Sequence, residues 1–198
     1  MTYRQINDKF IVCAFGRLLG SYTCSFERED YDPMTQFVAI RNNSTRLTYD
    51  INLNKTLIYS RSAQVVGIDY ERQLVYGLNP GVKQSYLQIM LKPATGGSLS
   101  YTNGELGFGT GSKVTAVDKS GNTKEYELVI FGDLNGDGYY DGQDAVLCNV
   151  ISSGLYDYGE ACTMAADCNH DGDITEEDSA MIAANGVMKN VEITQYPQ

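Results

Sequence analysis

The chain has 198 residues, of which 42% are hydrophobic and 20% charged, so it is long enough to bury a core and too apolar for wholesale disorder. Its net charge of −10 is uneven: residues 1–131 carry +2, whereas residues 132–198 carry −12 with Lys189 as their single basic residue. This acidic part would repel a phosphate backbone, which argues against nucleic acid as a partner. No run approaches the roughly 18 apolar residues of a membrane span.

The first predicted element is a β-hairpin formed by strands Phe10–Phe15 and Ser21–Phe26. Because side chains alternate between the two faces of a strand, Cys13 would lie opposite Cys24 in this hairpin. Such a pair is compatible with a disulfide or with two reduced thiols. The five cysteines are an odd number, so at least one is unpaired or pairs with another chain.

Short strand candidates separated by turns continue as far as residue 131. They are residues 36–40, 46–53, 57–59, 64–69, 73–77, 86–91, 98–101, 113–118 and 124–131. The turn Lys119–Asn122 joins the last two strands as a hairpin. Helical periodicity is absent from this part, so we expect an all-β region of sandwich type. A break near Ser62 would divide it into a β-rich region, 1–62, and a β-rich module, 63–131.

Two acidic loops of twelve residues dominate the C-terminal part, and they begin 34 residues apart at Asp133 and Asp167. Oxygen ligands at positions 1, 3, 5, 7 and 12 of such a loop can surround one hard cation, while glycine at position 6 permits the sharp turn. Acidic turns also occur without metals, but both loops match every position. The predicted ligands are Asp133, Asn135, Asp137, the Tyr139 carbonyl and Asp144 in the first loop, and Asp167, Asn169, Asp171, the Asp173 carbonyl and Asp178 in the second. The sequence therefore predicts two Ca²⁺ sites.

An apolar stretch after each loop predicts a helix, and residues 158–166 suit a further short helix between the two units. Cys148 and Cys168 fall where such a repeat needs small core residues, so we expect buried thiols there. Residues 191–196 alternate like a short strand or an extended tail. Calcium loops beside Tyr- and Gly-rich β sequence suit an exported protein, so we interpret the chain as a fragment of a secreted or cell-surface bacterial protein.

From residue 131 to 190 the chain resembles a dockerin, the calcium-dependent module that attaches enzymes and adhesins to cohesin modules of a scaffoldin in cellulosome-type assemblies. Phe131–Gly138 and Ala165–Asn169 carry the resemblance. The preceding residues, about 64–131, are similar to the small Ig-like or X-type β modules that often precede dockerins. The resemblance implies a multidomain α and β protein: an N-terminal all-β part, a C-terminal all-α dockerin at 132–190 with paired EF-hand-like loops, and a tail at 191–198.

The resemblance also implies cohesin contacts at loop positions 10 and 11 and helix positions 17, 18 and 22. These are Gly142, Gln143, Asn149, Val150 and Gly154 in the first unit, and Glu176, Glu177, Ala183, Ala184 and Met188 in the second. Many dockerins repeat a Ser-Thr-like pair at positions 10 and 11, which permits two opposite orientations. Here the pairs are Gly-Gln and Glu-Glu, which differ in charge and size, so we expect one binding mode. The alternative for the apolar positions is packing within the protein.

Catalytic groups are scarce, so the chain is not predicted to be an enzyme. His170 is the only histidine, which leaves little scope for a His-based triad or a zinc site. The four carboxylates between residues 27 and 32 suit a solvated loop better than a glycosidase pair. The glycine-rich run 104–109 lacks the following helix of a phosphate-binding loop, and we interpret its glycines as belonging to β-edges and turns.

Three hypotheses of function follow. The first is a non-catalytic docking module in which Ca²⁺ folds the C-terminal part, its helices bind a scaffoldin cohesin, and the β region braces or spaces it; polysaccharide would be a partner only through the parent protein. The alternative is a carbohydrate-binding or adhesin β module that carries the dockerin as an attachment tag, although tyrosines in strands more often pack than stack on sugars. The third is a purely intramolecular structural role.

Overall fold

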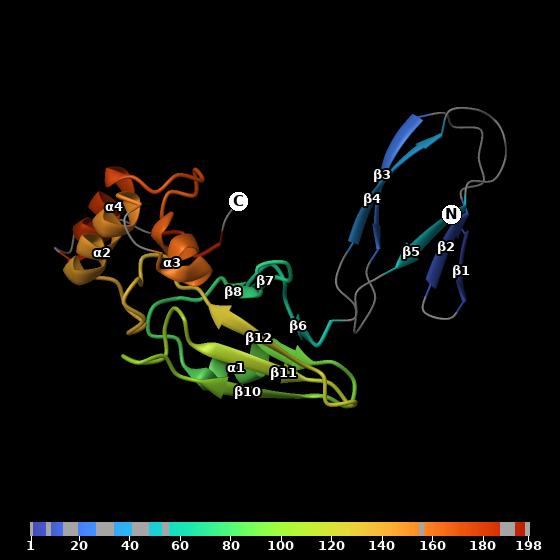
Figure 1. Cartoon of the computed structure of the whole chain (residues 1–198), viewed down its shortest axis with the longest axis horizontal. Coiled ribbons are helices and arrows are strands. Elements are labelled where there is room, and N and C mark those ends of the chain that lie inside the picture. Colours follow the sequence, from blue (N-terminus) through green and yellow to red (C-terminus); the bar gives the residue numbers. More distant parts are fainter. Residues whose placement is uncertain are drawn as a thin grey trace. The chain divides into compact units, whose positions relative to one another are not determined.

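The structure, a computed structural model, divides into two compact units, Met1–Thr56 and Leu57–Gln198. It describes residues 56–154, 157–186 and 193–196, and the backbone of the strands before them. The first unit contains a three-stranded antiparallel sheet of order β1-β2-β5 and a separate antiparallel pair, β3-β4 (Figure 1). The bounds are Thr2–Ile6 (β1), Lys9–Cys13 (β2), Gly20–Phe26 (β3), Met34–Ile40 (β4) and Thr48–Asn52 (β5).

The expected hairpin between residues 10–15 and 21–26 is wrong. Strand β2 is paired on both sides, by β1 and by β5, and Cys13 lies opposite Thr2 and Thr48. Strand β3 pairs instead with β4, where Cys24 lies opposite Gln36. A strand with two partners has no free edge for a third, so these cysteines are not cross-strand neighbours. Their side chains, and the carboxylates between residues 27 and 32, lie outside the described residues.

The second unit contains a five-stranded sheet of order β10-β11-β12-β8-β7. Its ladders are antiparallel except for the parallel pair β12-β8. The bounds are Gly67–Asp69 (β7), Leu74–Tyr76 (β8), Ser98–Thr102 (β10), Lys113–Val117 (β11) and Thr123–Leu128 (β12). Strands β6 (Ile58–Ser60) and β9 (Leu91–Pro93) form a separate antiparallel pair. Strand β6 pairs with β9 of the second unit, so residues 58–60 belong to that unit. The division between the units, after Thr56, therefore precedes the break expected near Ser62.

Two predicted elements of this sheet region have different outcomes. The hairpin around Lys119–Asn122 is confirmed, since β11 and β12 pair in register and Asp118 Oδ1 accepts the backbone N–H groups of Ser120 and Asn122 at 2.7 and 2.9 Å. The strand predicted at 86–91 is wrong, because helix α1 (Gln84–Met90) occupies most of it. Apolar residues are so dense there that periodicity does not separate strand from helix, and burial of Leu87 decides the outcome.

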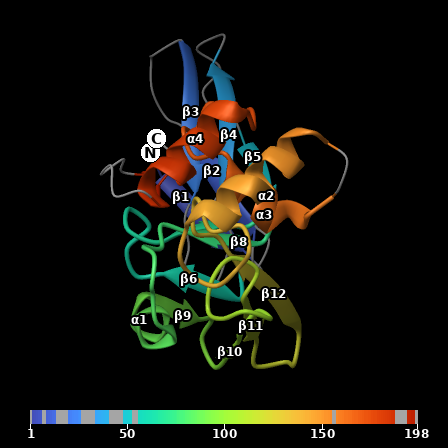
Figure 2. The same cartoon turned by 90° about the vertical axis from the view of Figure 1, so that its left-hand side faces the viewer.

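Three further helices follow the sheet: α2 (Gly142–Ser152), α3 (Gly159–Ala166) and α4 (Glu176–Gly186). They confirm the helices predicted after the two loops and at 158–166. Helix α2 begins with a capping box: the Asp141 side chain accepts the backbone N–H of Asp144, and the Asp144 side chain accepts the backbone N–H of Asp141. Helices α2 and α4 lie side by side, and Ser179 Oγ donates to the Ala145 carbonyl at 3.1 Å (Figure 2). None of the helices in the described residues is long and apolar enough to cross a membrane.

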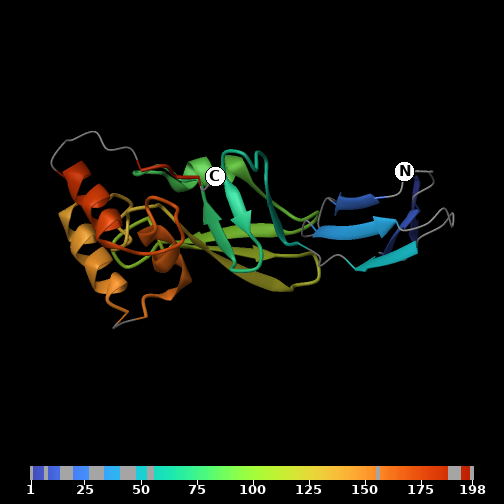
Figure 3. The same ribbon diagram turned by 90° about the horizontal axis from the view of Figure 1, so that it is seen from above.

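The prediction of an all-β part followed by a separate all-α module is wrong. Residues 57–198 form one compact unit of two sheets and four helices, an α/β mix. One hydrophobic core joins Leu74 of β8 and Phe131, just beyond β12, to Cys148 of α2 and Ile182 of α4. Figure 3 shows β12 leading directly toward the helices. The change in net charge at residue 132 therefore reflects the acidic loops and not a domain boundary.

Cys148 and Cys168 are free and buried within this shared core, as predicted. A second core lies within the sheet region and around α1, and it includes Val75, Leu87 and Tyr126. The two acidic loops therefore lie beside the core that the sheet and the helices share.

The segment 193–196 completes the shared core at the C-terminal end. The Gln195 amide pairs with both backbone groups of Phe131: the Phe131 N–H donates to Oε1 at 2.8 Å, and Nε2 donates to the Phe131 carbonyl at 3.0 Å. The Tyr196 ring packs edge-on against Tyr76 of β8, with 5.2 Å between the centroids. Within the predicted strand or tail at 191–196, only residues 193–196 are described, and they are not in a strand.

We expect Gln195→Ala to lower the free energy of unfolding by about 1–3 kcal/mol, because it leaves both backbone groups of Phe131 without their partner. Urea unfolding followed by circular dichroism measures this change. The matched control is Thr194→Ala, since the Thr194 residue is exposed and its carbonyl, which contacts His170, is kept. Equal effects of the two exchanges would contradict the role given to the amide.

Candidate metal centre

The carboxylate at position 1 points into its own loop in both acidic loops. Asp133 Oδ2 accepts the N–H of Gly138 at 3.0 Å, and Asp167 Oδ2 accepts the N–H of Gly172 at 3.1 Å. These donors occupy position 6 of their loops, so the same bond closes both loops. The oxygens at position 1 are thereby held on the inner side of the turn.

Positions 3 and 5 repeat the pattern with turns of the Asx type. Asn135 Oδ1 accepts the N–H of Asp137 at 2.8 Å, and Asn169 Oδ1 accepts the N–H of Asp171 at 3.0 Å. The carboxylate at position 5 then accepts the N–H of position 7 at 2.9 Å in each loop. These short-range bonds arise from Asp and Asn side chains two residues before the donor, which is the local chemistry that favours such turns.

The carboxylates at position 12, Asp144 and Asp178, are both fully buried. Each accepts backbone N–H groups from positions 2, 3 and 9 of its loop, at 2.8–2.9 Å in the first loop and 2.8–3.1 Å in the second. Because these residues also lie in the first turns of α2 and α4, each of them joins the loop to the start of its helix.

The backbone conformation repeats as well. Position 6 is left-handed in both loops, with φ of 90° at Gly138 and 92° at Gly172, and so is position 4, with φ of 81° at Gly136 and 61° at His170. A left-handed conformation is uncommon for a residue other than glycine and persists where the surroundings enforce it. His170 is therefore accounted for by the loop fold, and its ring packs edge-on against Phe131 at 4.4 Å between centroids.

The electrostatics of the first loop suit a cation. Burial, opposed by backbone N–H groups and reinforced by the Asp144 charge, raises the pKa of Asp133 to about 6. Burial also raises the pKa of Asp144. Two buried carboxylates of raised pKa are stabilised in their charged form by a nearby positive charge, which a divalent ion would supply.

The donor set fits Ca²⁺ in particular. Across the described residues, no three His, Cys, Asp or Glu side chains form a metal cluster by themselves. The predicted ligand sets also contain Asn amides and a backbone carbonyl, which are hard oxygen donors of the kind that Ca²⁺ binds. An ionised carboxylate has about four lone-pair sites, so those used by N–H donors leave others for a cation. The residues that would hold the ions are the ten predicted from the spacing.

The predicted partner contacts fall on the neighbouring helices α2 and α4 and their first turns. Most are exposed: Gly142, Gln143, Asn149, Gly154, Glu176, Glu177 and Ala183; Val150 and Ala184 are half-buried, and Met188 lies outside the described residues. The sequence reasoning missed Val146, whose exposed fraction is 63%. Val146 precedes Val150 by four residues and so shares its helix face, a spacing that could have indicated it.

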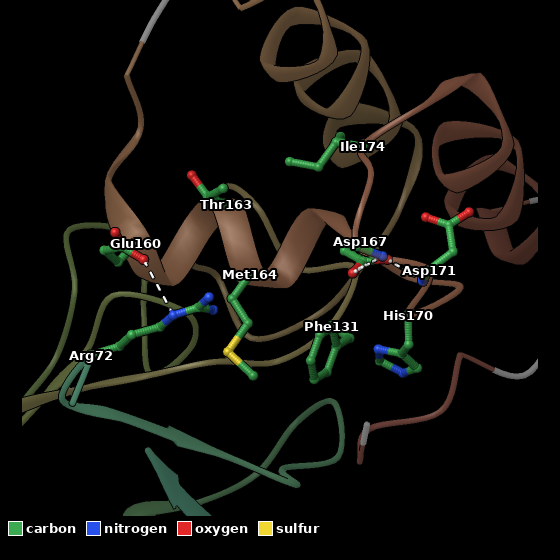
Figure 4. Close-up of a pocket in the computed structure, with 10 residues that line it drawn as sticks. Arg72, Phe131, Glu160, Thr163, Met164, Asp167, His170, Asp171 and Ile174 are labelled. Atoms are coloured by element: carbon green, nitrogen blue, oxygen red, sulfur yellow. Dashed lines mark hydrogen bonds and ion pairs between the residues drawn. The ribbon is translucent and has the colours of Figure 1, made fainter. Parts of the chain in front are cut away.

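A cavity of about 480 Å³ lies beside the second loop (Figure 4). Met164 of α3 and Phe131 line its apolar side, and His170 and Asp171 belong to the loop side. At its rim, Arg72 Nε lies 4.0 Å from the Glu160 carboxylate, and this ion pair contributes little because both side chains are exposed. Since the loop itself forms one wall, the shape of the cavity depends on the second loop.

We expect Asp144→Ala and Asp178→Ala each to remove one of the two Ca²⁺ ions bound per chain, because each exchange deletes the position-12 ligand and three backbone hydrogen bonds of its loop. Isothermal titration calorimetry measures the stoichiometry. Glu177→Ala, which removes an exposed carboxylate next to Asp178, should keep both ions. A wild-type stoichiometry in either Asp variant would contradict the ligand assignment.

Comparison of the chain with protein-family models, with curated proteins and with solved structures finds no match. The case for cation binding therefore rests on the spacing of the ligands and on the hydrogen bonds that both loops share.

Proposed function

We propose that residues 57–198 form a calcium-dependent docking unit, in which Ca²⁺ orders two acidic loops and the helices that leave them, α2 and α4, bind a cohesin-like protein. The observation that carries the proposal is the repeated loop: the same hydrogen bonds recur 34 residues apart, and each loop starts one of two helices that pack together. In this proposal the docking face belongs to a mixed α/β unit.

The surface of the two helices supports protein binding. Val146 is 63% exposed on α2, and the exposed Ala183 lies on α4. The 34-residue repeat pairs Asn149 with Ala183 and Val150 with Ala184, so both helices offer the same positions to a partner. The buried centre of a protein–protein interface is more apolar than the rest of the surface, so small and apolar exposed side chains at these positions suit such a contact.

Calcium acts on the fold in this proposal and performs no chemistry. Without a cation, the buried carboxylates Asp133 and Asp144 of the first loop repel each other's negative charge, in a part of the chain that carries −12. Removing the ion therefore destabilises the loops and the first turns of both helices, because metal binding and folding are coupled. The partner-binding face is lost with them.

One orientation of binding follows from the ends of the helices. Gly142 and Gln143 are exposed at the start of α2, whereas Glu176 and Glu177 are exposed at the start of α4. Rotating the unit by its internal repeat would exchange a neutral pair for two negative charges. A partner complementary to one end is therefore repelled by the other.

We expect calorimetry against a panel of cohesins to detect binding in Ca²⁺ and none in EDTA. A double exchange of Asn149 and Val150 to Asp, or the single exchange Val146→Asp, should weaken the affinity about tenfold or more, since each introduces charge into the proposed contact. A double exchange of Ala183 and Ala184 to Asp tests the α4 side of the face.

Ile89→Asp is the matched control, because Ile89 is 62% exposed and lies on α1, away from the loops, α2 and α4, and it should leave cohesin binding unchanged. If the helix exchanges are silent, the face is misassigned. If no cohesin binds but glycans are retained on an array, the alternative of a carbohydrate-binding β module replaces this proposal.

A further inference from the structure

We propose that residues 104–112, termed here the glycine cradle, preorganise the first calcium loop, so that the two sites have unequal affinity and the first fills before the second. The proposal rests on calcium binding by both loops. It assigns to the sheet region a positioning role in cation binding.

The cradle holds its own shape through one buried hydroxyl. Ser112 Oγ accepts the backbone N–H groups of Gly104 and Gly109 at 3.0 and 3.1 Å and donates to the Gly107 carbonyl at 3.3 Å. Ser112 is fully buried, and its carbonyl accepts the N–H of Leu128 of β12 at 2.8 Å. The cradle is therefore fixed to the sheet by bonds that involve no cation ligand.

One backbone N–H of the cradle donates a hydrogen bond to a predicted calcium ligand. The N–H of Thr110 donates to Asp133 Oδ2 at 2.9 Å, and the donor is buried. The Thr110 hydroxyl is held in turn by the backbone of Ile130, whose N–H donates to Oγ1 at 3.0 Å and whose carbonyl accepts from it at 3.2 Å. Thr110 thus connects Ile130, just beyond β12, to the position-1 carboxylate of the first loop through three hydrogen bonds.

Glycines on both sides permit this close approach. A Cβ added to Gly109 would overlap Asp133 Oδ2, and a Cβ added to Gly136 would lie 2.6 Å from the Thr110 carbonyl oxygen. At Gly107 it would lie 3.1 Å from the Asp137 carbonyl oxygen. Any larger residue at the tightest of these positions would push the loop away from the cradle. The glycines of the run 104–109, which the sequence assigns to β-edges and turns, therefore allow the cradle to pack closely against the first loop.

Within the described residues, nothing comparable packs against the equivalent position of the second loop. A Cβ at Gly138 would lie 2.8 Å from the Phe108 carbonyl oxygen of the cradle, whereas one at Gly172, the same loop position, would meet nothing within 4 Å. Asp133 is fully buried, but Asp167 is half-buried, and Asp171 and Asp173 are exposed. On the side of position 6, the described residues therefore cover the first loop and leave the second exposed.

Rigidity distinguishes the two sites because the charges of their ligand side chains are equal. Each loop offers three ligand carboxylates and one amide, at positions 1, 5, 12 and 3. With the same ligand charge, the affinity of such a loop depends on the rigidity of its site, and a loop that is already ordered loses less conformational entropy on binding. The first site therefore binds more tightly, which we expect to amount to about tenfold.

Terbium titration of the full chain tests the order. Tyr139 is at position 7 of the first loop, where the second loop has Asp173, so Tb³⁺ in the first loop should be sensitised by excitation of tyrosine. We expect emission to rise during the first equivalent of Tb³⁺, and Tyr139→Phe should reduce that first rise. A rise confined to the second equivalent would overturn the proposal.

Gly109→Ala tests the cradle itself, and Gly104→Ala is the matched control because its Cβ would meet only ordinary contacts, at 3.6 and 3.8 Å. We expect Gly109→Ala to weaken the tighter calcium site about tenfold in calorimetry and to leave the weaker one within about twofold. Equal weakening of both sites would mean a general structural effect and would overturn the positioning role.

Two measurements keep the outcomes separate. Urea unfolding of each variant in EDTA shows whether Gly109→Ala has lost its fold. In that case Thr110→Val, which keeps the shape of the side chain and removes the two hydrogen bonds that hold Thr110 against Ile130, takes its place and should give the same split between the sites. If wild-type protein binds no Ca²⁺ at all, the proposed function fails. If it binds two ions with equal affinity, only the cradle proposal fails.

Discussion

The structure depends on the burial of one continuous stretch, Val129 to Leu134, at the point where the sheet region leads into the first loop. Its backbone is bonded to three elements: Val129 N–H to Val75 of β8 at 2.8 Å, Phe131 to Gln195, and Gly132 N–H to Ala165 of α3 at 2.8 Å. Buried backbone groups must find partners, so the sheet, α3 and the C-terminal segment cannot separate without leaving these groups unpaired. This constraint makes residues 57–198 one unit.

The same stretch explains how an acidic sequence can sit against an apolar core. Within each repeat, position 2 and a residue of the following helix face inward, which places Leu134 and Cys148 from the first unit beside Cys168 and Ile182 from the second, all buried. The carboxylates alternate with these residues and turn toward backbone N–H groups. The predicted cation ligands and the core residues are therefore different residues of the same loops, and both groups of residues position α2 and α4.

The ligand spacing allowed the loops to be predicted, because an Asp or Asn at a fixed position captures a backbone N–H two residues on whatever surrounds it. The β11-β12 hairpin and α3 were predictable for the same reason, since their signals are local. The pairing of β2 with β5, the burial of α1 and the shared core depend on contacts between residues distant in the sequence. The role of the cradle could not be predicted either, because the glycines between Gly104 and Gly109 resemble ordinary turn glycines in the sequence. Only the fold shows that Asp133 lies against Gly109.

The two loops are thus alike in their internal bonds and different in what surrounds them. The second loop also touches a distant segment, since His170 Nε2 lies 2.7 Å from the Thr194 carbonyl oxygen, but that contact engages position 4, which supplies no predicted ligand. The contact from Thr110 to Asp133 engages a ligand directly. A repeated loop can therefore acquire unequal roles without any change in its ligands, because the surrounding fold sets how much order each loop has before a cation binds.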